Sequence, residues 1–416
     1  MKNEKIIYDN LKNFIDNCTE KNYRTPDYKY NIALPTKGEP ILFKNNELHK
    51  LVNNIIEDKV LGENFSGGAE KFLTNKIMDM ITSYKYIKNR STDYVAQKII
   101  NMLKEKKVPY TFFLPVYGIK VSSIYPENYK NIAICPAKYK NDQINNFIKT
   151  KNLKKSDRLS EEMNTTDSKK SYIFIKVYAN NSETAKELSL SYANDLILAL
   201  HSIYSNIDNS YIIGIGDDED YTSSISALYY KDDGIIQETS RRKDNKSFPL
   251  QVDLSLTNSE NNILKVFMSI LNNKIKNNQS IKAEDIENKI YSSIKYIGRA
   301  TIESNLEQAF LDLMIAIESL VEEKDFSQNI TDQICERCAE LLSNELETRT
   351  SMYSKLKALY TKRSNLVHGS KKPKITLSDL YYLRGISLQL CIYFVKNIEK
   401  FKNINWHDFY LKLRFN

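Results

Sequence analysis

The stretch Tyr360-Thr-Lys-Arg-Ser-Asn-Leu-Val-His-Gly369 is the most informative part of this chain. It has an arginine, Arg363, five residues before a histidine, His368, at the end of a segment with helical periodicity. Arginine keeps its charge and presents a planar fork of donors that matches phosphate oxygens. Histidine ordinarily titrates near neutrality, so it can accept or release a proton. Together the two side chains could bind a phosphodiester and move protons around it without a metal ion.

The glycine that closes this stretch indicates where the helix ends. The helix is expected to end near Val367, because Gly369 suits the position after a C-cap and Pro373 follows closely. His368 would then lie at the carboxyl end, where the helix dipole favours a positive charge. Five residues turn through about 500° along an ideal helix, so Arg363 and His368 would lie about 140° apart. Either the last turn is distorted, or a second copy of the chain completes the site in a symmetric dimer.

Basic residues are concentrated around this motif. Between Arg349 and Lys374 the sequence has eight Lys and Arg residues and no Asp or Glu. We predict that four residues near the motif contact nucleic acid, the lysines through phosphate and the tyrosine by stacking on a base: Lys362, Lys371, Lys372 and Tyr360. The alternative is that the lysines are ordinary solvated charges of a helix and a loop.

Length and composition bound the class of protein. The chain has 416 residues, more than one hydrophobic core usually holds, so at least two domains are expected. Its net charge of +8 is modest for this length and does not by itself indicate a nucleic-acid binder. The amino terminus lacks the apolar run of a signal peptide, and no stretch approaches about 18 consecutive apolar residues. We therefore expect a cytoplasmic protein without a membrane span.

The cysteines favour packing over metal binding. They are five in number and scattered, which is typical of a reducing cytosol. Cys335 and Cys338 form one CxxC pair, but a zinc site would need a second pair of ligands, and none lies at a recognisable spacing. On a helix the two share a face, so we interpret them as packing thiols. We predict no metal and no cofactor.

Two glycine-containing motifs do not indicate a nucleotide site. Gly214-Ile-Gly216 lacks the third glycine and the following helix of a dinucleotide fingerprint. The acidic run 217–220 behind it is better explained as a solvated turn than as a cation site. The chain has no GxxxxGK[ST] sequence, because Gly369-Ser-Lys-Lys lacks the upstream glycine, so a nucleotide-binding enzyme is a poor interpretation.

The predicted elements divide the chain into three regions of an α+β fold. Residues 1–107 are expected to be mostly helical, with loops around the prolines at 26, 35 and 40. Residues 108–255 mix strands with a helix over about 181–204, and their polar stretch 141–170 resembles an exposed loop. Residues 256–416 repeat apolar residues at three- and four-residue spacing, which predicts a helical bundle that contains the motif.

The expected elements can be stated as ranges. The predicted strands are 110–118, 131–135, 172–178, 211–216, 224–230 and 235–239, with a hairpin turn at 231–234. The predicted helices before the bundle are about 70–86 and 93–106. Those of the bundle are 259–275, 282–299, 301–322, 328–346, 349–367 and 377–400.

Two segments in the bundle resemble a known family. Residues 355–369, with the form Arg-Ser-x-x-Val-His-Gly, resemble the RX4-6H motif of HEPN domains, in particular the Apea-like HEPN group. Upstream, Ile294–Ala300 followed by Phe310–Leu320 is similar to a part of that group in which a helix with a Leu/Ile-Glu-x-Leu pattern packs near the motif. The two motifs stand in the right order, about 45 residues apart, and the resemblance covers about residues 258–400.

The resemblance implies a metal-independent endoribonuclease, typically dimeric and often part of antiviral defence or toxin systems. Arg363 and His368 match the catalytic pair. Glu318 matches the glutamate of the upstream helix and either orients Arg363 through an ion pair or has a purely structural role. Many HEPN enzymes have Asn, Asp or His after the arginine, whereas this chain has Ser364 and then Asn365. Either of these could hold a phosphate oxygen or orient the histidine.

The implied reaction is attack of an RNA 2′-hydroxyl on the adjacent phosphorus, so tRNA or mRNA is the expected partner. Arg363 would stabilise the negative charge that develops on the phosphoryl oxygens, and His368 would act as base or acid. The alternative is a non-catalytic HEPN module that binds RNA or a partner protein. By analogy of architecture alone, the region before the bundle would sense a viral or cellular trigger.

Overall fold

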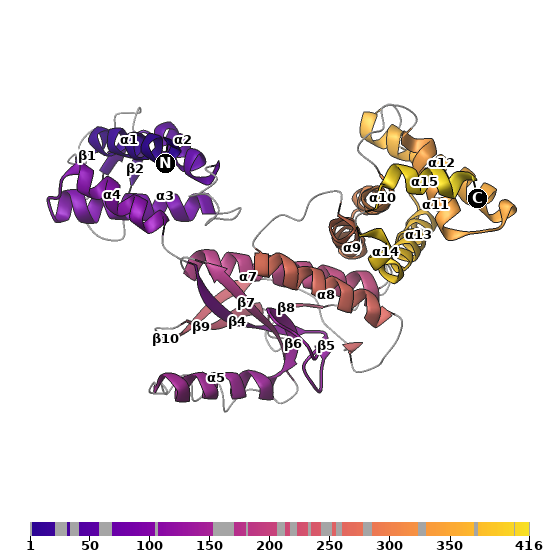
Figure 1. Cartoon of the computed structure of the whole chain (residues 1–416), viewed down its shortest axis with the longest axis horizontal. Helices are drawn as coiled ribbons and strands as arrows, with labels where there is room; N and C mark the ends of the chain where they lie inside the picture. Colours follow the sequence, from indigo (N-terminus) through magenta and orange to yellow (C-terminus); the bar gives the residue numbers. More distant parts are fainter. Residues whose placement is uncertain are drawn as a thin grey trace. The chain divides into compact units, whose positions relative to one another are not determined.

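The computed structural model describes most of the chain (Figure 1). The described residues are 2–20, 31–33, 41–57, 69–104, 107–152, 170–179, 182–205, 213–216, 223–231, 234–242, 252–254, 260–277, 285–322, 330–369, 373–402 and 404–415. They form two compact units, one of Met1–Tyr110 with Val177–Leu190 and one of Thr111–Lys176 with Ser191–Asn416. The fold is α+β with a helical C-terminal region, as the sequence predicted.

The helices of the first unit enclose one apolar core. They are α1 (Lys2–Asn17), α2 (Asn45–Glu57), α3 (Ala69–Met80), the π-helix η2 (Ile81–Ile87) and α4 (Thr92–Leu103). Leu11, Val52, Ile77 and Ile99, one from each α-helix, are all fully buried in this core. The predicted helices 70–86 and 93–106 are confirmed, with the second one ending a turn early because α4 stops at Leu103.

A small sheet in the first unit was not predicted. Strands β1 (Thr19–Glu20), β2 (Asn31–Ala33) and β3 (Ile41–Phe43) pair antiparallel in the order β1-β3-β2. The prolines at 26, 35 and 40 predict only loops here. Strands of two or three residues are too short to have a visible alternation of apolar and polar residues, so no pattern could reveal them.

A larger sheet lies mostly in the second unit. Its strands are β4 (Val108–Tyr117), β6 (Ile132–Pro136), β7 (Ser171–Ala179), β8 (Gly214–Ile215), β9 (Ser223–Lys231) and β10 (Gly234–Arg242). Their order is β10-β9-β4-β7-β6, with β8 pairing β4. A separate parallel pair joins β5 (Ile119–Lys120) to β11 (Val252–Asp253). The predicted β9–β10 hairpin is confirmed, because Lys231 pairs with Gly234; the two turn residues between them lie outside the described residues.

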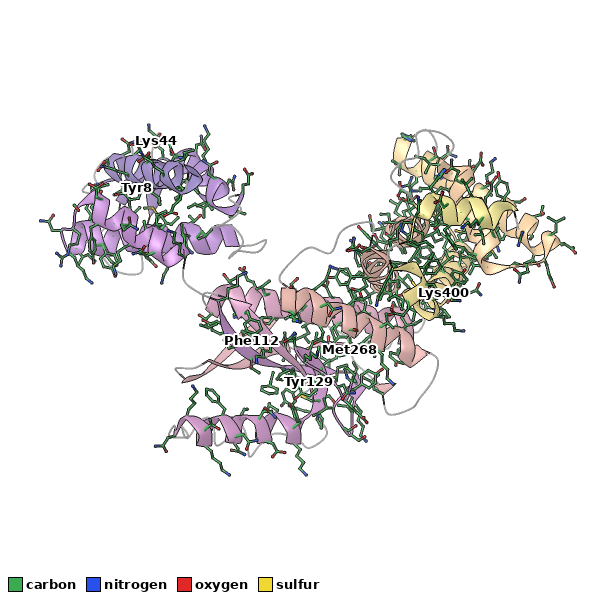
Figure 2. The ribbon with its side chains drawn as sticks, viewed as in Figure 1. Tyr8, Lys44, Phe112, Tyr129, Met268 and Lys400 are labelled. Atoms are coloured by element: carbon green, nitrogen blue, oxygen red, sulfur yellow. The ribbon has the colours of Figure 1, made fainter. Side chains whose placement is uncertain are left out.

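Helices cover both faces of this sheet (Figure 1). Helix α5 (Ala137–Lys151) lies on one side, and α7 (Ser182–Tyr204) and α8 (Glu260–Asn277) lie on the other. Neighbouring strand residues point to opposite faces. Phe113 accordingly packs with α5. Phe112 is also fully buried and faces the other side of the sheet, which α7 and α8 cover; it is labelled in Figure 2 together with Met268 of α8.

Helix α5 corrects one prediction. The polar stretch from residue 141 was expected to be an exposed loop, but it is helical as far as Lys151. Ile144 is fully buried in the cluster below the sheet, and Ile148 packs against the same cluster. This four-residue spacing is a narrow apolar stripe, which the surrounding polar residues concealed. Residues 153–169 lie outside the described part.

The C-terminal helices from α9 onward form a bundle, as predicted. They are α9 (Ile286–Ile302), α10 (Leu306–Val321), α11 (Ile330–Leu342), α12 (Leu346–His368), α13 (Leu377–Lys396), α14 (Ile398–Phe401) and α15 (Trp406–Phe415). Helix α8, predicted over 259–275 as the first helix of the bundle, instead covers the sheet and also contacts α9 and α13. Helix α10 supplies much of the core, since Phe310, Leu313 and Ile317 are all fully buried. Asn305 caps α10 by accepting hydrogen bonds from two backbone amides of its first turn. Helix α15 was not predicted. No helix among the described residues is both long and apolar enough to cross a lipid bilayer.

The second half of α7 is packed tightly against the bundle. Gly298 of α9 lies so close that a Cβ atom there would be 2.0 Å from the carbonyl oxygen of Leu198. Arg384 of α13 donates hydrogen bonds to the carbonyl oxygens of Ser202 and Ser205, at 2.9 and 2.5 Å. These are carbonyls at the end of α7 that lack partners within the helix, so the arginine acts as a cap.

Candidate functional site

The motif lies on an uninterrupted helix. Helix α12 remains α-helical through His368, and Gly369 follows with φ of 66°, the left-handed conformation that a glycine cap provides. The predicted helix end is therefore confirmed. His368 is exposed at the carboxyl end. Since the last turn is regular, Arg363 and His368 project from different faces of α12, and a distorted turn does not bring them together.

Arg363 forms the ion pair that the sequence suggested. Its Nη2 donates to Oε2 of Glu318 at 3.1 Å and so joins α12 to α10. The glutamate side chain is 14% exposed and the arginine side chain 35% exposed. Burial raises the pKa of Glu318, and the charge of Arg363 opposes part of that rise. The pair holds the guanidinium group at the bundle surface, where the arginine side chain stays partly exposed.

The predicted stacking role of Tyr360 is wrong in this structure. The side chain is only 5% exposed, because it lies on the inner face of α12. Burial, and then the nearby charge of Glu318, raise the pKa of Tyr360. A ring in this position contributes to the core and the environment of the ion pair, and it has no free face for a base.

Lys362 is also paired. Its Nζ donates to Oδ2 of Asp379 at 2.7 Å, which ties the end of α12 to the start of α13. Thr376 and Asp379 form a capping box at that start. Burial acts to raise the pKa of Asp379, but hydrogen bonds from Lys362 and Thr376 outweigh it, so the pKa is lowered. Lys362 therefore has a structural contact in addition to any contact with a ligand.

Other basic residues near the motif likewise have partners. Lys357 lies 2.8 Å from Asp332 of α11, and Nζ of Lys355 lies 3.8 Å from the ring centroid of Tyr382. The positive excess counted in the sequence is thus reduced by acidic residues from other helices. These acids lie outside the basic stretch of sequence and are not predicted from it, although Thr376-x-x-Asp379 is a recognisable capping signature.

The remaining predicted residues fall into two groups. Ser364 is exposed and Asn365 half-buried on the last two turns of α12, so both can be reached from solvent near His368. Lys371 and Lys372 lie outside the described residues, and so does the acidic run 217–220.

The cysteines behave as packing residues. Cys335 and Cys338 are both buried in α11, as predicted, and burial raises the pKa of each thiol. Among the described residues no cluster of three or more His, Cys, Asp or Glu side chains could hold a metal ion.

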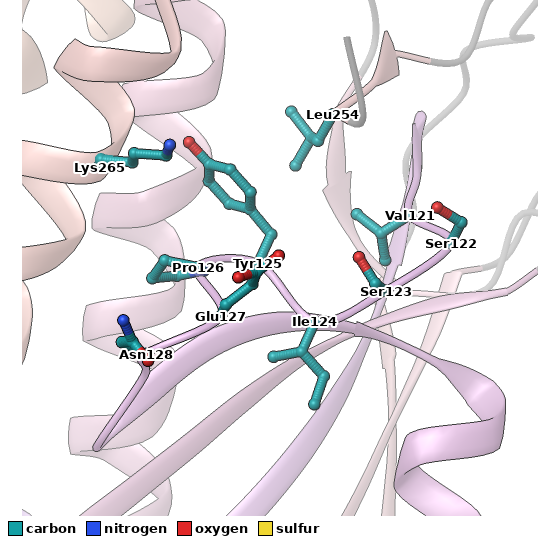
Figure 3. Close-up of a pocket in the computed structure, with 10 residues that line it drawn as sticks. All are labelled: Val121, Ser122, Ser123, Ile124, Tyr125, Pro126, Glu127, Asn128, Leu254 and Lys265. Carbon is teal, nitrogen blue, oxygen red and sulfur yellow. The ribbon is translucent and has the colours of Figure 1, made fainter. Parts of the chain in front are cut away.

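A cavity of about 430 Å³ lies elsewhere in the second unit (Figure 3). The segment 121–128 lines it together with Leu254 and Lys265. The hydroxyl group of Tyr125 points toward the amine of Lys265 in this cavity (Figure 3). None of the motif residues contributes to its lining.

Comparisons with known proteins found no match: no family model, no curated protein and no solved structure is significantly similar to this chain.

Proposed function

We propose that this chain is a metal-independent endoribonuclease of the HEPN type, whose active centre combines Arg363 and His368 from two copies of the chain. The observation that carries the proposal is the regular end of α12, with Arg363 held by Glu318 and His368 exposed at the last helical position. Within one chain these side chains diverge. In a symmetric dimer that packs the ends of the two α12 helices together, the arginine of one copy can approach the histidine of the other.

The exposed surface near the motif supports such a dimer. Val367, next to His368, is 58% exposed, and Leu377 at the start of α13 is 43% exposed. Burying apolar side chains of this size is favourable. A second copy is the partner that would cover them while completing the site. The proposed assembly is a homodimer or a higher even oligomer.

The proposed chemistry needs only groups of this chain. One histidine takes the proton of the RNA 2′-hydroxyl, and the oxygen attacks the adjacent phosphorus. The guanidinium group stabilises the negative charge on the phosphoryl oxygens, with Glu318 fixing its orientation. The same histidine, now protonated, gives that proton to the leaving 5′-oxygen. Ser364 and Asn365 are close enough along the helix to help hold a phosphate oxygen. The products carry a 2′,3′-cyclic phosphate and a 5′-hydroxyl.

The biological setting that we propose rests on the resemblance of the motifs alone. Enzymes of this kind are often effectors of antiviral defence or toxins that act on tRNA or mRNA in the cytoplasm. The residues before the bundle would then sense a trigger or restrain the nuclease.

The second candidate is a non-catalytic HEPN module that binds RNA or a partner protein. It is favoured by one specific observation: Arg363 and Lys362 are both engaged by carboxylates of the same chain. Such contacts could serve the bundle alone, without any reaction.

The experiment that separates these two candidates is an RNA cleavage assay in EDTA, with total tRNA and a long single-stranded RNA. Wild type should cleave and leave cyclic phosphate ends, while His368→Ala and Arg363→Ala should not. His407 is an exposed histidine of α15, so His407→Ala is a matched control that should keep full activity. Arg299 pairs with Asp312 of α10 at 3.4 Å, so Arg299→Ala is the matched control for the arginine. Cleavage that survives in the Arg363→Ala/His368→Ala double variant would exclude the proposed site.

A further inference from the structure

An aromatic and basic cluster in the first unit has no part in the proposed active centre. It consists of Tyr84, Lys88, Arg90 and Tyr94, at the junction of η2 and α4. The ring centroids of the two tyrosines lie 5.9 Å apart with their planes tilted by 58°. Nζ of Lys88 lies 4.8 Å from the Tyr84 ring centroid, and Cζ of Arg90 lies 5.6 Å from that of Tyr94. We call these four residues the Tyr84–Tyr94 surface.

The backbone fixes this arrangement. The π-helix ends with the amide of Lys88 bonded to the carbonyl of Ser83, and Asn89 follows with φ of 47°. The amide of Arg90 then donates to the carbonyl of Tyr84 at 2.8 Å. Ser91 caps α4 by accepting from the amide of Tyr94. A short corner stabilised by these bonds therefore brings both cations to the two rings. Single turns of π-helix are frequent at functional sites.

The surface is accessible and positively charged. Tyr94 is 40% exposed, Lys88 and Arg90 are exposed, and Tyr84 is half-buried against the core. The segment 81–104 has five Lys and Arg residues and one acid, Asp93. The carboxylate of Asp93 already accepts contacts from Lys12 and Tyr8 of α1, both at 2.9 Å. The cations of the Tyr84–Tyr94 surface thus have no carboxylate partner among the described residues and rest on rings instead.

We propose that the Tyr84–Tyr94 surface binds single-stranded RNA. Aromatic faces interleaved with cations are the arrangement that holds unpaired nucleotides, because bases stack on the rings while the cations contact the phosphates. Contacts between exposed cations and rings are weak, so Lys88 and Arg90 can leave the rings for phosphate when RNA binds. A duplex should bind this surface poorly, because its bases are already stacked on each other and cannot stack on the two rings. The choice of RNA as the ligand rests on the proposed function. The arrangement of the rings and the positive charge is observed independently of that function.

The test is a binding titration that is independent of cleavage. The full chain carries His368→Ala so that RNA stays intact, and a short labelled single-stranded RNA is titrated by fluorescence anisotropy over a range of salt concentrations. Tyr94→Ala should weaken binding by about 5- to 150-fold, whereas Tyr94→Phe, which keeps the ring, should bind nearly as the parent does. Lys88→Gln combined with Arg90→Gln should reduce the slope of log affinity against log salt by about 1.4.

Matched controls make the result decisive. Lys50→Gln removes an exposed lysine from α2 of the same unit and should leave affinity for single strands unchanged. Thermal unfolding establishes that each variant is folded, and the charge variants avoid the core contacts that Tyr84 makes. The proposal would be overturned if affinity and salt slope were unchanged in both Tyr94→Ala and the Lys88→Gln/Arg90→Gln variant. Equal losses of affinity for duplex and single-stranded RNA would also overturn it. Cleavage by wild type with unchanged binding in these variants would refute this surface while leaving the proposed nuclease standing.

Discussion

Replacing Arg363 with alanine removes the partner of a carboxylate that is mostly buried. The two groups lie 3.1 Å apart, and the side chain of Glu318 is 14% exposed whereas that of Arg363 is 35% exposed. At an effective dielectric constant of about 20, unit charges at this distance attract by about 5 kcal/mol. Desolvation, lost rotamer freedom and solvent screening of the exposed part of the arginine offset most of this. We therefore expect a net coupling free energy of about 1–2 kcal/mol.

The same variant should change how stability depends on pH. Burial raises the pKa of Glu318, and Arg363 partly counteracts the rise, so the pKa should be higher still in Arg363→Ala. A carboxyl group with a higher pKa in the folded chain binds its proton more readily when folded. Its contribution to stability is then greatest at low pH and falls as pH rises from the ordinary glutamate value of about 4.3 through the raised one. That fall should be larger in Arg363→Ala than in wild type.

The assay is urea unfolding of wild type, Arg363→Ala, Glu318→Gln and the double variant, at several pH values. A parallel cycle with Arg299→Ala and Asp312→Asn provides a reference pair that joins α9 to the same helix α10, with the two side chains 3.4 Å apart. A coupling free energy below about 0.3 kcal/mol for Arg363 and Glu318 would refute the inferred ion pair, because values that small are within the additivity of independent sites. An identical pH profile for Arg363→Ala and wild type would refute the reasoning about burial.

Three further predictions concern the structure around the site. In urea unfolding, Gly298→Ala should destabilise the chain by about 2 kcal/mol or more, because its Cβ would lie 2.0 Å from a backbone oxygen of α7. Gly385→Ala is the control and should be neutral or stabilising, because no atom lies within 4 Å of the added carbon. Gly369→Ala should cost about 1 kcal/mol by the same measurement, because its φ is +66°. The five cysteines are buried, and burial raises the pKa of Cys335, for example, to about 12. They should therefore resist thiol reagents at neutral pH until the chain unfolds. Fast labelling of the native chain would contradict their placement.

Features that depend on neighbouring residues in the sequence could be predicted. The end of α12 is one example, since a glycine cap and a following proline act locally on the helix, and the structure has the cap at Gly369. The apolar repeat of α10 likewise predicted a buried helix, because a three- and four-residue spacing fixes one face. The ion pair between Glu318 and Arg363 was suggested only through the resemblance of two motifs.

Features that depend on packing between distant elements could not be predicted. Tyr360 was expected to be exposed because its neighbours are basic, but the face that α12 turns toward the core is set by α10 and α11. The partner of Lys362 is 17 residues away on α13, so the local excess of positive charge said nothing about it. The helical nature of α5 was hidden because few of its residues need to be apolar when only one narrow stripe contacts the sheet.

The central claim is that two copies of the chain complete one active centre, and a mixing experiment tests it directly. Arg363→Ala and His368→Ala are each purified, then unfolded and refolded together, and RNA cleavage in EDTA is compared with wild type treated in the same way. Each mixed dimer would contain one intact pair, formed by the arginine of one copy and the histidine of the other. Random mixing should therefore restore about a quarter of wild-type activity. No cleavage by the mixture, alongside full activity of refolded wild type, would contradict the shared site.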